Sequence, residues 1–338
     1  MTRTMLWRRG ALGAVTVGAL AAGTLGLAPL ATAAPTITVD RISGANRVET
    51  AVEASKALFD DVGGLNTASA VVLASSEGFA DGVSGGPLAA SAGGPLLLTK
   101  GASLDPATAT EITRILAKGG TVDVLGGVGA ISADVATSLT GLGFIVNRLQ
   151  GADRYGTAVA VADSMPASKT VLLTSGAVFP DALSAGPAAA HVGGVVLLTK
   201  GATMPSATQA YLTAHAGDEV FAVGGDAAKA APSTAADHQL VGVDRYETGT
   251  KVAAHFFSQP VLLTFASGEN FPDALSGGAF ASLIDSPILL VRSAVVPAFV
   301  TTYLKANQTT VTHAALVGGV GVVSETVRTS LEGTLNGV

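Results

Sequence analysis

The sequence lacks cysteine altogether and is poor in aromatic and charged residues. Aromatic residues make up 5% of the 338 residues and charged residues 13%, whereas 48% are hydrophobic and 42 residues are glycine. Without cysteine no disulfide framework can hold an exported form of this chain, so a packed core has to hold the fold. The hydrophobic content supplies such a core and excludes an intrinsically disordered chain.

Long apolar runs are scarce too, and the one exception lies near the N-terminus. Residues 10–27 are uniformly apolar, follow a basic segment and precede the small-residue sequence Ala31-Thr32-Ala33. This order is typical of a secretory signal peptide, which we place at residues 1–33, and it predicts a secreted protein. The alternative is an uncleaved membrane anchor, which the short Ala- and Gly-rich run disfavours. We expect no membrane contact after cleavage. The basic segment carries Arg3, Arg8 and Arg9.

An excess of basic residues is also missing. The predicted signal peptide holds three of the 19 basic residues and none of the 25 acidic ones, so its removal leaves a net charge of −9. A nucleic-acid-binding protein needs a basic face, and this balance argues against that class. Any binding to an anionic polymer must therefore rely on local basic positions or on a bridging cation.

Signs of catalytic or cofactor chemistry are weak. The five histidines are scattered and none recurs at an equivalent place, so we expect no catalytic zinc or other metal site. The segment 82–86 matches the Gly-x-Ser-x-Gly elbow of hydrolases, but Ser84 lies well past the end of the expected strand. The Gly-Gly pairs complete no nucleotide-binding motif, and we interpret them as tight turns. The sequence predicts no catalytic residue and no cofactor.

The chain does contain one pattern of motifs that occurs three times. An Arg-Tyr-x-Thr type segment, a Phe-x-Asp segment and an apolar run ending in Gly-Gly recur in the same order. The arginine of the first segment recurs after 107 and then 91 residues, and the aspartate of the second after 100 and then 92. A period near a hundred residues indicates a domain-sized unit. The segments are 41–50, 148–157 and 239–248; 71–89, 171–187 and 261–278; and 122–127, 220–225 and 314–319.

Within the first copy, apolar strands alternate with helices. Strands are expected at 36–39, 71–74, 95–98 and 122–125, and helices at 47–59, 81–92, 110–118 and 132–139. Strands that are apolar on both faces and alternate with helices indicate a parallel sheet covered on both sides, an α/β fold. We expect Asn46, Asp81 and Ser132 to cap the helices that follow them. No Pro/Ser-rich or charged linker separates the copies, so we expect three packed units.

Taken together, these motifs closely resemble the cell-wall-binding repeat type 2 family of exported Gram-positive proteins. The resemblance covers nearly all of residues 36–338 in three copies. It implies α/β units packed around a pseudo-threefold axis and non-covalent attachment to anionic secondary polymers of the cell wall. We place the repeats at residues 34–143, 144–236 and 237–338.

The first copy departs most from the family pattern. Asn46 stands where the pattern has Asp, Val48 replaces Tyr, and Ala80 replaces the Pro of the other two copies. In the third copy, Gln239 stands where the others carry Arg41 and Arg148.

Four sets of residues are candidates for ligand binding, and each has a structural alternative. The arginines suit a phosphate or carboxylate, because a guanidinium binds such groups at two points; alternatively they pair with the aspartates or link units. The aspartates and serines start a small-residue helix whose exposed N–H groups would hold an anion; alternatively they cap it. The basic residues after the Leu-Leu strands lie at strand ends, where open parallel sheets place ligands; alternatively they are solvated loop charges. The sets are Arg47, Arg154 and Arg245; Asp81, Asp181 and Asp273; Ser84, Ser184 and Ser276; and Lys100, Lys200 and Arg292.

The sequence therefore predicts a secreted, non-catalytic protein of the cell wall or cell surface. Its expected partner is an anionic cell-wall glycopolymer or a polymer linked to peptidoglycan, bound through three repeats. One alternative is a wall-acting, amidase-like hydrolase that uses one copy as its active site, although no segment is left over for a separate catalytic domain. The other is a secreted module that binds a protein partner.

Overall fold

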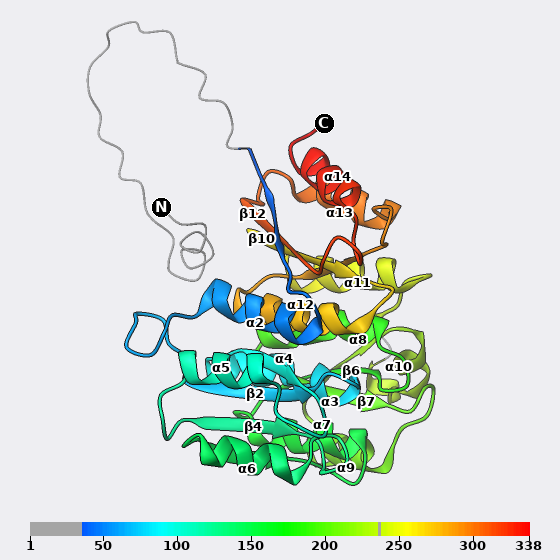
Figure 1. Cartoon of the computed structure of the whole chain (residues 1–338). Coiled ribbons are helices and arrows are strands. Elements are labelled where there is room, and N and C mark those ends of the chain that lie inside the picture. The colour runs from blue at the N-terminus through cyan, green and yellow to red at the C-terminus, as the bar shows by residue number, and fades with distance from the viewer. Residues whose placement is uncertain (1–35, 236–237) are drawn as a thin grey trace, which may run out of the picture.

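Three parallel sheets, one for each copy of the repeat, form the framework of the chain (Figure 1). The computed structural model describes residues 36–235 and 238–338, so the predicted signal peptide lies outside the described residues. Each sheet has four strands, and all pairs of neighbouring strands are parallel. This arrangement confirms the predicted α/β class with three homologous units.

The strands follow the continuous apolar runs of the sequence. All six residues of β2 (Ala70–Ser75) are buried, as are all six of β10 (Leu262–Ser267), because helices cover both faces of each sheet. In spatial order the sheets contain β3 (Leu96–Thr99), β2 (Ala70–Ser75), β4 (Thr121–Leu125) and β5 (Ile145–Leu149); β7 (Val195–Thr199), β6 (Thr170–Ser175), β8 (Glu219–Val223) and β9 (Gln239–Leu240); and β11 (Ile288–Val291), β10 (Leu262–Ser267), β12 (His313–Val317) and β1 (Val39–Ile42).

The edge strand of each sheet leads into the helix of the following copy. β5 pairs with β4 and β9 pairs with β8, although the chain runs from each of them into the arginine-led helix of the next copy. In the same way β1 pairs with β12, with Val39 opposite Ala314 and Ile42 opposite Val317. Figure 1 shows this N-terminal strand, in blue, running beside the orange strands of the third unit. The three units therefore form a closed ring, while the predicted repeat boundaries stay a prediction.

A helix begins at each conserved arginine, and its N-terminus is capped as the sequence predicts. Asn46 accepts hydrogen bonds from the amides of Val48 and Glu49, and Asp153 and Asp244 do the same in the other copies. Such caps stabilise a helix by about 1 kcal/mol. Asn46 therefore replaces Asp without loss of the cap. These helices are α2 (Arg47–Leu58), α7 (Arg154–Ser164) and α11 (Arg245–Phe256).

A second set of helices, which follow the Phe-x-Asp segments, packs together at the centre of the ring. Their glycines allow a close approach, as the sequence predicts. A Cβ on Gly186 would lie 3.7 Å from the carbonyl oxygen of Val83, and one on Gly278 would lie 3.5 Å from that of Leu183. Contacts of this kind join all three units in pairs. The central helices are α3 (Ala80–Val83) and α4 (Gly85–Ala92), then α8 (Pro180–His191) and α12 (Phe271–Leu283).

The outer helices complete the covering of the sheets, and two expected boundaries are wrong. The strand expected at 36–39 is β1 at Val39–Ile42. The helix expected at 110–118 begins at Pro106, because Asp105 accepts a hydrogen bond from the Ala107 amide and proline suits the first turn. Ser132 occupies the expected N-cap position, but its hydroxyl donates to the Ala102 carbonyl instead of capping the helix. These helices are α5 (Pro106–Ile115), α6 (Ala133–Gly141), α9 (Ser206–Ala214), α10 (Gly225–Ala230), α13 (Ala298–Asn307) and α14 (Glu325–Leu335), with a 3₁₀ turn at Ser233–Ala235.

Within residues 36–235 and 238–338, no helix combines the length and apolar character that crossing a bilayer requires.

Candidate functional site

Three phenylalanines meet where the central helices begin. Phe79, Phe179 and Phe271 come from the three copies of the Phe-x-Asp segment, and their ring centroids lie 5.9 to 6.0 Å apart. The rings are tilted or edge-on to one another, which is the favoured geometry for aromatic pairs. We call this group the phenylalanine trio. Its three nearly equal distances mark the pseudo-threefold axis of the ring.

Each conserved arginine lies over a phenylalanine of the preceding unit. The guanidinium carbon of Arg154 is 5.9 Å from the centroid of Phe79, and that of Arg245 is 5.8 Å from Phe179. Arg47 closes the cycle, 5.7 Å from Phe271. These distances are those of cation–π contacts, which contribute roughly 0.5–1 kcal/mol at exposed sites. The arginines therefore join units across every junction of the ring.

One guanidinium nitrogen of each arginine is fixed by the backbone of its own unit. The Nη1 atom of Arg47 donates to the Ser76 carbonyl at 2.7 Å, and that of Arg154 donates to the Gly176 carbonyl at 2.8 Å. Arg245 donates to the corresponding carbonyl of Gly268 at 2.5 Å. Arg47 and Arg154 are exposed residues, and one nitrogen of each guanidinium is held by the carbonyl. This leaves donors in place for an anionic ligand.

The conserved aspartates do not cap the central helices, and that expectation is wrong. Asp81 and Asp181 lie in the first turn, whereas the cap positions are Phe79 and Phe179, which make no side-chain capping bond. In the third copy Asp273 likewise follows the cap position. The reason is that Phe-x-Asp puts the aspartate two residues inside the helix. The aspartate side chains are thereby turned toward the neighbouring unit.

Burial raises the pKa of each of these aspartates. For Asp81, the charge of Arg154 and the side chain of Thr157, both in the next unit, partly offset the effect of burial on the pKa. Arg47 and Thr50 act on the pKa of Asp273 in the same way. No N–O contact within 4.0 Å joins these Arg–Asp pairs in the described residues. The recurring Arg and Asp therefore attract each other across units without a direct ion pair.

Two further carboxylates act on the buried aspartate of the second junction. Burial raises the pKa of Asp181, Thr248 and Arg245 lower it, and Asp226 and Asp244 raise it further. Asp226 comes from α10, and its Oδ2 accepts a hydrogen bond from the Ser175 hydroxyl at 3.4 Å.

Sequence reasoning missed two partners of the aspartates. The Thr157 hydroxyl accepts a hydrogen bond from the Gly151 amide, so its own proton is free to point toward Asp81. The glycine that ends the apolar run meets the same aspartate, since a Cβ on Gly126 would lie 2.5 Å from its Oδ2. Gly126 also has a φ of +90°, which favours glycine. The threefold recurrence of both residue types was the available signal, and the positive φ confirms the predicted tight turn.

The three candidate serines lie inside the protein. Ser84, Ser184 and Ser276 are 1 to 3% exposed. The hydroxyls of Ser84 and Ser184 donate to backbone carbonyls of their own first turn, those of Asp81 and Asp181. The first turns of these helices are also buried at Ala80, Pro180 and Pro272, and proline carries no N–H. The residues that begin these helices are therefore largely buried, and we leave the serines out of the proposed site.

The basic residues after the Leu-Leu strands lie on the same edge of the sheets as the arginines. Lys100, Lys200 and Arg292 are all exposed. Arg292 lies over the ring of Tyr246, 4.7 Å from its centroid, and so has a structural contact that the lysines lack. The structure thus brings nine of the twelve candidate residues to the carboxyl ends of the strands. That edge is where open parallel sheets place ligands.

A cleft opens at the junction of the first and second units. It has a volume of about 640 Å³, and both units and Phe271 of the third unit line it. Phe79, Asp81 and Arg154 lie on its walls, together with Glu77. The cleft combines a guanidinium, carboxylates and aromatic edges in one solvent-accessible space. This combination suits a polar ligand with an acidic group.

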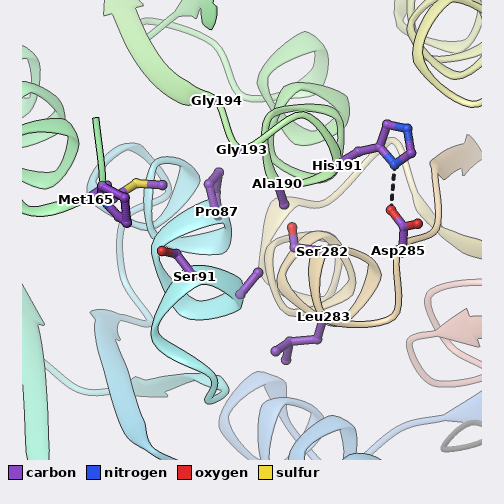
Figure 2. A pocket seen from close by; sticks show the side chains of 12 residues that line it. Pro87, Ser91, Met165, Ala190, His191, Gly193, Gly194, Ser282, Leu283 and Asp285 are labelled. Carbon is purple, nitrogen blue, oxygen red and sulfur yellow. Dashed lines mark hydrogen bonds and ion pairs between the residues drawn. The ribbon is translucent and has the colours of Figure 1, made fainter. Parts of the chain in front are cut away.

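A second pocket, of about 470 Å³, lies where the central helices end (Figure 2). Ala90, Ala190 and Ser282 come from the last turns of α4, α8 and α12, so the three helices run in the same direction along the axis. At its edge the Nδ1 of His191 lies 2.6 Å from Oδ1 of Asp285 in the neighbouring unit. Figure 2 shows Ser91 on the other side of this pocket from His191.

Comparison with known proteins identifies the repeats. Three segments, residues 41–136, 148–231 and 239–328, match the family described as cell wall binding domain 2 (CWB2). The chain belongs to this family. The matches confirm three tandem cell-wall-binding repeats, and membership indicates a partner in the cell wall and a location at the wall or cell surface.

Two similar proteins come from Bacillus subtilis (strain 168). The N-acetylmuramoyl-L-alanine amidase LytC is 28% identical over 260 residues, which are 75% of this chain and 50% of that protein. A protein described as amidase enhancer is 28% identical over 259 residues, which are 77% of this chain and 35% of that protein. This chain therefore spans half or less of the length of these relatives.

Two solved structures share the fold. Cwp8 from Clostridium difficile has a TM-score of 0.78 at 24% identity, covering 89% of this chain and 52% of that one. Cwp6 from Clostridium difficile has a TM-score of 0.79 at 24% identity, covering 92% of this chain and 51% of that one. At this identity the likeness supports the fold alone, and it agrees with the three-unit ring.

Proposed function

We propose that this is a secreted, non-catalytic cell-wall-binding protein that attaches non-covalently to an anionic secondary polymer of the wall. The observation that carries the proposal is the threefold repetition of one arrangement. At every junction an arginine lies over a phenylalanine and beside an aspartate of the preceding unit. The Asp and Arg residues that the sequence singles out thereby form three similar sites.

Arginine is the residue that suits this ligand. Its planar guanidinium recognises a phosphate or carboxylate through two donors, and here one nitrogen is already fixed by a backbone carbonyl. A donor held in place loses less conformational entropy on binding than a free side chain does. Arg47 and Arg154 are exposed enough to meet a polymer without any movement of the backbone.

The central helices add a favourable field. α3, α8 and α12 begin at the phenylalanine trio, and α4, α8 and α12 end at the second pocket, so the dipoles of α8 and α12 point the same way. The N-terminus of a helix carries about half a positive charge, and the N-termini of α8 and α12 lie beside the phenylalanine trio that the arginines contact. This field supports an anion at the junctions although the chain as a whole is acidic.

Three similar sites on one rigid ring suit a polymer better than a small ligand. Each junction would bind weakly, but a chain that reaches a second site does so at a high effective concentration. Close packing of the central helices holds the sites at fixed separations. Strong attachment then needs no deep pocket.

The non-catalytic part of the proposal rests on the burial of the one elbow-like serine. Ser84 is 1% exposed and its hydroxyl donates to the Asp81 carbonyl, so it is not available as a nucleophile. Zymography of the mature chain on wall substrate checks this point. A lytic band would contradict it and would favour the amidase-like alternative, whereas capture of one wall protein in place of the polymer would favour a protein-interaction module.

A wall pull-down tests the binding itself. The chain from residue 34 is mixed with purified walls that carry their secondary polymers and with walls stripped of them, and equal retention on both would contradict the proposal. Arg47, Arg154 and Arg245 are then changed to alanine singly and together, with loss expected to steepen from one change to three. The matched control is Lys169→Ala, because Lys169 precedes β6 at the opposite edge of the sheet and pairs with Asp218. Circular dichroism verifies folding.

A further inference from the structure

Each unit places one acidic side chain at the same spot of its junction, but by two different routes. In the first and third units the acid comes from the loop after the central strand, as Glu77 and Glu269. The second unit has Ala177 at that position. There the acid is Asp226, which comes from the first turn of α10, in the loop after a different strand.

The distances place these carboxylates next to equivalent residues. Glu77 Oε2 accepts from the Gly101 amide at 3.4 Å, and Glu269 Oε2 accepts from the Ser293 amide at 3.1 Å. The corresponding residue of the second unit is Gly201. A Cβ built on Gly101 would lie 3.1 Å from Glu77 Oε2, and one built on Gly201 would lie 3.8 Å from Asp226 Oδ2. Loops that follow different strands of the unit thus place a carboxylate oxygen next to equivalent residues.

The structural role of the acid in units one and three does not extend to the second unit. In units one and three the carboxylate also satisfies a loop amide, which would be reason enough for its presence. Among the described residues, Asp226 has a hydrogen bond from Ser175 and none from the Gly201 amide. Its charge instead raises the pKa of Asp181, an unfavourable effect inside the junction. The second unit therefore keeps an acid at this position, although this acid does not bond the loop amide.

The surroundings of these acids are those of the proposed binding site. Glu77 lines the cleft that also holds Arg154 and Phe79. In the third unit Glu269 is exposed, and the Ser293 side chain and amide hold its pKa below the usual range, with smaller effects from Arg292 and Arg245. An ionised carboxylate is a pure acceptor, so it binds ligand groups that donate hydrogen bonds.

We infer that Glu77, Asp226 and Glu269 are ligand-contacting residues, each accepting a hydrogen bond from a hydroxyl or amide N–H of the saccharide whose acidic group the junction arginine binds. This inference rests on the proposed function and narrows its ligand to an acidic polymer rich in donor groups. A bare polyphosphate chain would offer no donors to these oxygens. An acidic sugar offers both kinds of group on one ring.

Removing the three negative charges changes wall binding in opposite directions for the two possible roles. The direction of the change therefore shows whether the acids contact the ligand or are bystanders that only lie near it. Bystander acids would repel an anionic polymer, so their neutralisation would strengthen binding. Ligand acids form charge-assisted hydrogen bonds, whose loss weakens binding about tenfold or more. The test variant combines Glu77→Gln, Asp226→Asn and Glu269→Gln. Amides keep the size of each side chain and can still accept from Gly101 and Ser293, so the fold is retained.

The charge-matched control combines Glu53→Gln, Asp163→Asn and Glu219→Gln. These acids lie within α2, in the last turn of α7 and at the start of β8, away from the carboxyl ends of the strands. Both triple variants are titrated against purified walls with and without their secondary polymers. We expect the junction variant to bind polymer-bearing walls at least about tenfold more weakly than the control variant.

Two results would overturn the inference, and they are distinguishable. Equal or tighter binding by the junction variant, with the unmodified chain still selective for polymer-bearing walls, contradicts the ligand role of the acids alone. Equal retention of the unmodified chain on both kinds of wall contradicts the proposed function and the inference with it.

Discussion

The guanidinium of Arg154 lies 5.9 Å from the centre of the Phe79 ring, and the two residues belong to different repeats. The same relationship joins Arg245 to Phe179 and Arg47 to Phe271. One residue thus has a stabilising contact and a proposed ligand contact at once. Because the two roles use different features of the side chain, substitutions can separate them.

Arg→Lys changes at positions 47, 154 and 245 separate charge from shape. Lysine keeps the charge but has neither the planar fork nor the stacking face of arginine. We expect wall retention to fall nearly as far as with alanine, and the free energy of unfolding to fall by about 0.5–1 kcal/mol per site. Pull-down and urea denaturation measure the two effects. Full retention by the triple lysine variant would mean that charge alone binds the polymer.

The buried aspartates predict a pH dependence of stability. Burial raises the folded-state pKa of Asp81, Asp181 and Asp273, so protonation favours the folded state. Their stabilisation is fully present below the unfolded pKa of about 3.9 and is lost as the pH rises through the raised folded values. We expect the unmodified chain to lose stability, relative to a triple Asp→Asn variant, as the pH rises above about 4.

Urea denaturation of both proteins at several pH values measures this difference. The asparagine variant serves as the reference because it cancels the titration of all other groups and resembles the protonated carboxyls in shape. A stability difference that stays constant with pH, or that moves the other way, would contradict the assignment.

The sequence was sufficient for the parts of the fold that local rules control. The apolar runs became β2 and β4 almost to the residue, and Asn46 capped its helix as expected. Because the unit occurs three times, each local inference applied to three copies. The motifs also pointed to the correct family, since several of them agree in order and spacing.

Relations between units were not accessible in the same way. Nothing local indicates that β1 pairs with β12, because the two strands are far apart in the chain. The aspartates were expected to cap their own helices, with pairing to the arginines as an alternative, whereas the structure turns them toward Arg and Thr of the next unit. The phenylalanine trio was missed because each phenylalanine looks like an ordinary core residue until the three meet on the axis.

One departure of the first copy now has a physical explanation. A Cβ on Gly268 would lie 2.7 Å from Cε1 of Tyr246, which is closer than side-chain atoms tolerate. Copy two shows the same pairing between Gly176 and Tyr155, at 3.0 Å. The first copy has a serine at this glycine position and Val48 in place of the tyrosine. The smaller valine leaves room for the serine, so the two departures compensate each other.

A double-mutant cycle tests this compensation. Gly268→Ser should destabilise the protein by about 1–3 kcal/mol through overpacking. Tyr246→Val removes the ring that the serine meets, so the double variant should be less destabilised than the sum of the two single variants. Thermal or urea unfolding provides the three values. Simple additivity would show that the residues do not compete for space.

Removal of residues 36–42 tests the closure of the ring. These residues supply β1, and the side chains of Ile37, Val39 and Ile42 are at least 91% buried. Burial of such side chains contributes roughly 1.5–3 kcal/mol each, so a chain that begins at residue 43 should lose several kcal/mol. The loss should concentrate in the third unit, because β1 pairs only with β12 among the described strands. Hydrogen exchange of the β12 amides should accelerate far more than that of the β2 amides.

The matched control for this truncation is Arg41→Gln, which reproduces the residue that the third copy carries naturally at Gln239. Arg41 donates to the Gly318 carbonyl at 2.7 Å and pairs with Glu325 at 3.2 Å, so its loss should cost about 1–3 kcal/mol and leave the strand in place. Exchange in β12 should then stay slow. If truncation and the glutamine variant accelerate exchange equally, the arginine contacts close the ring; if neither does, the third unit is stable without its N-terminal strand.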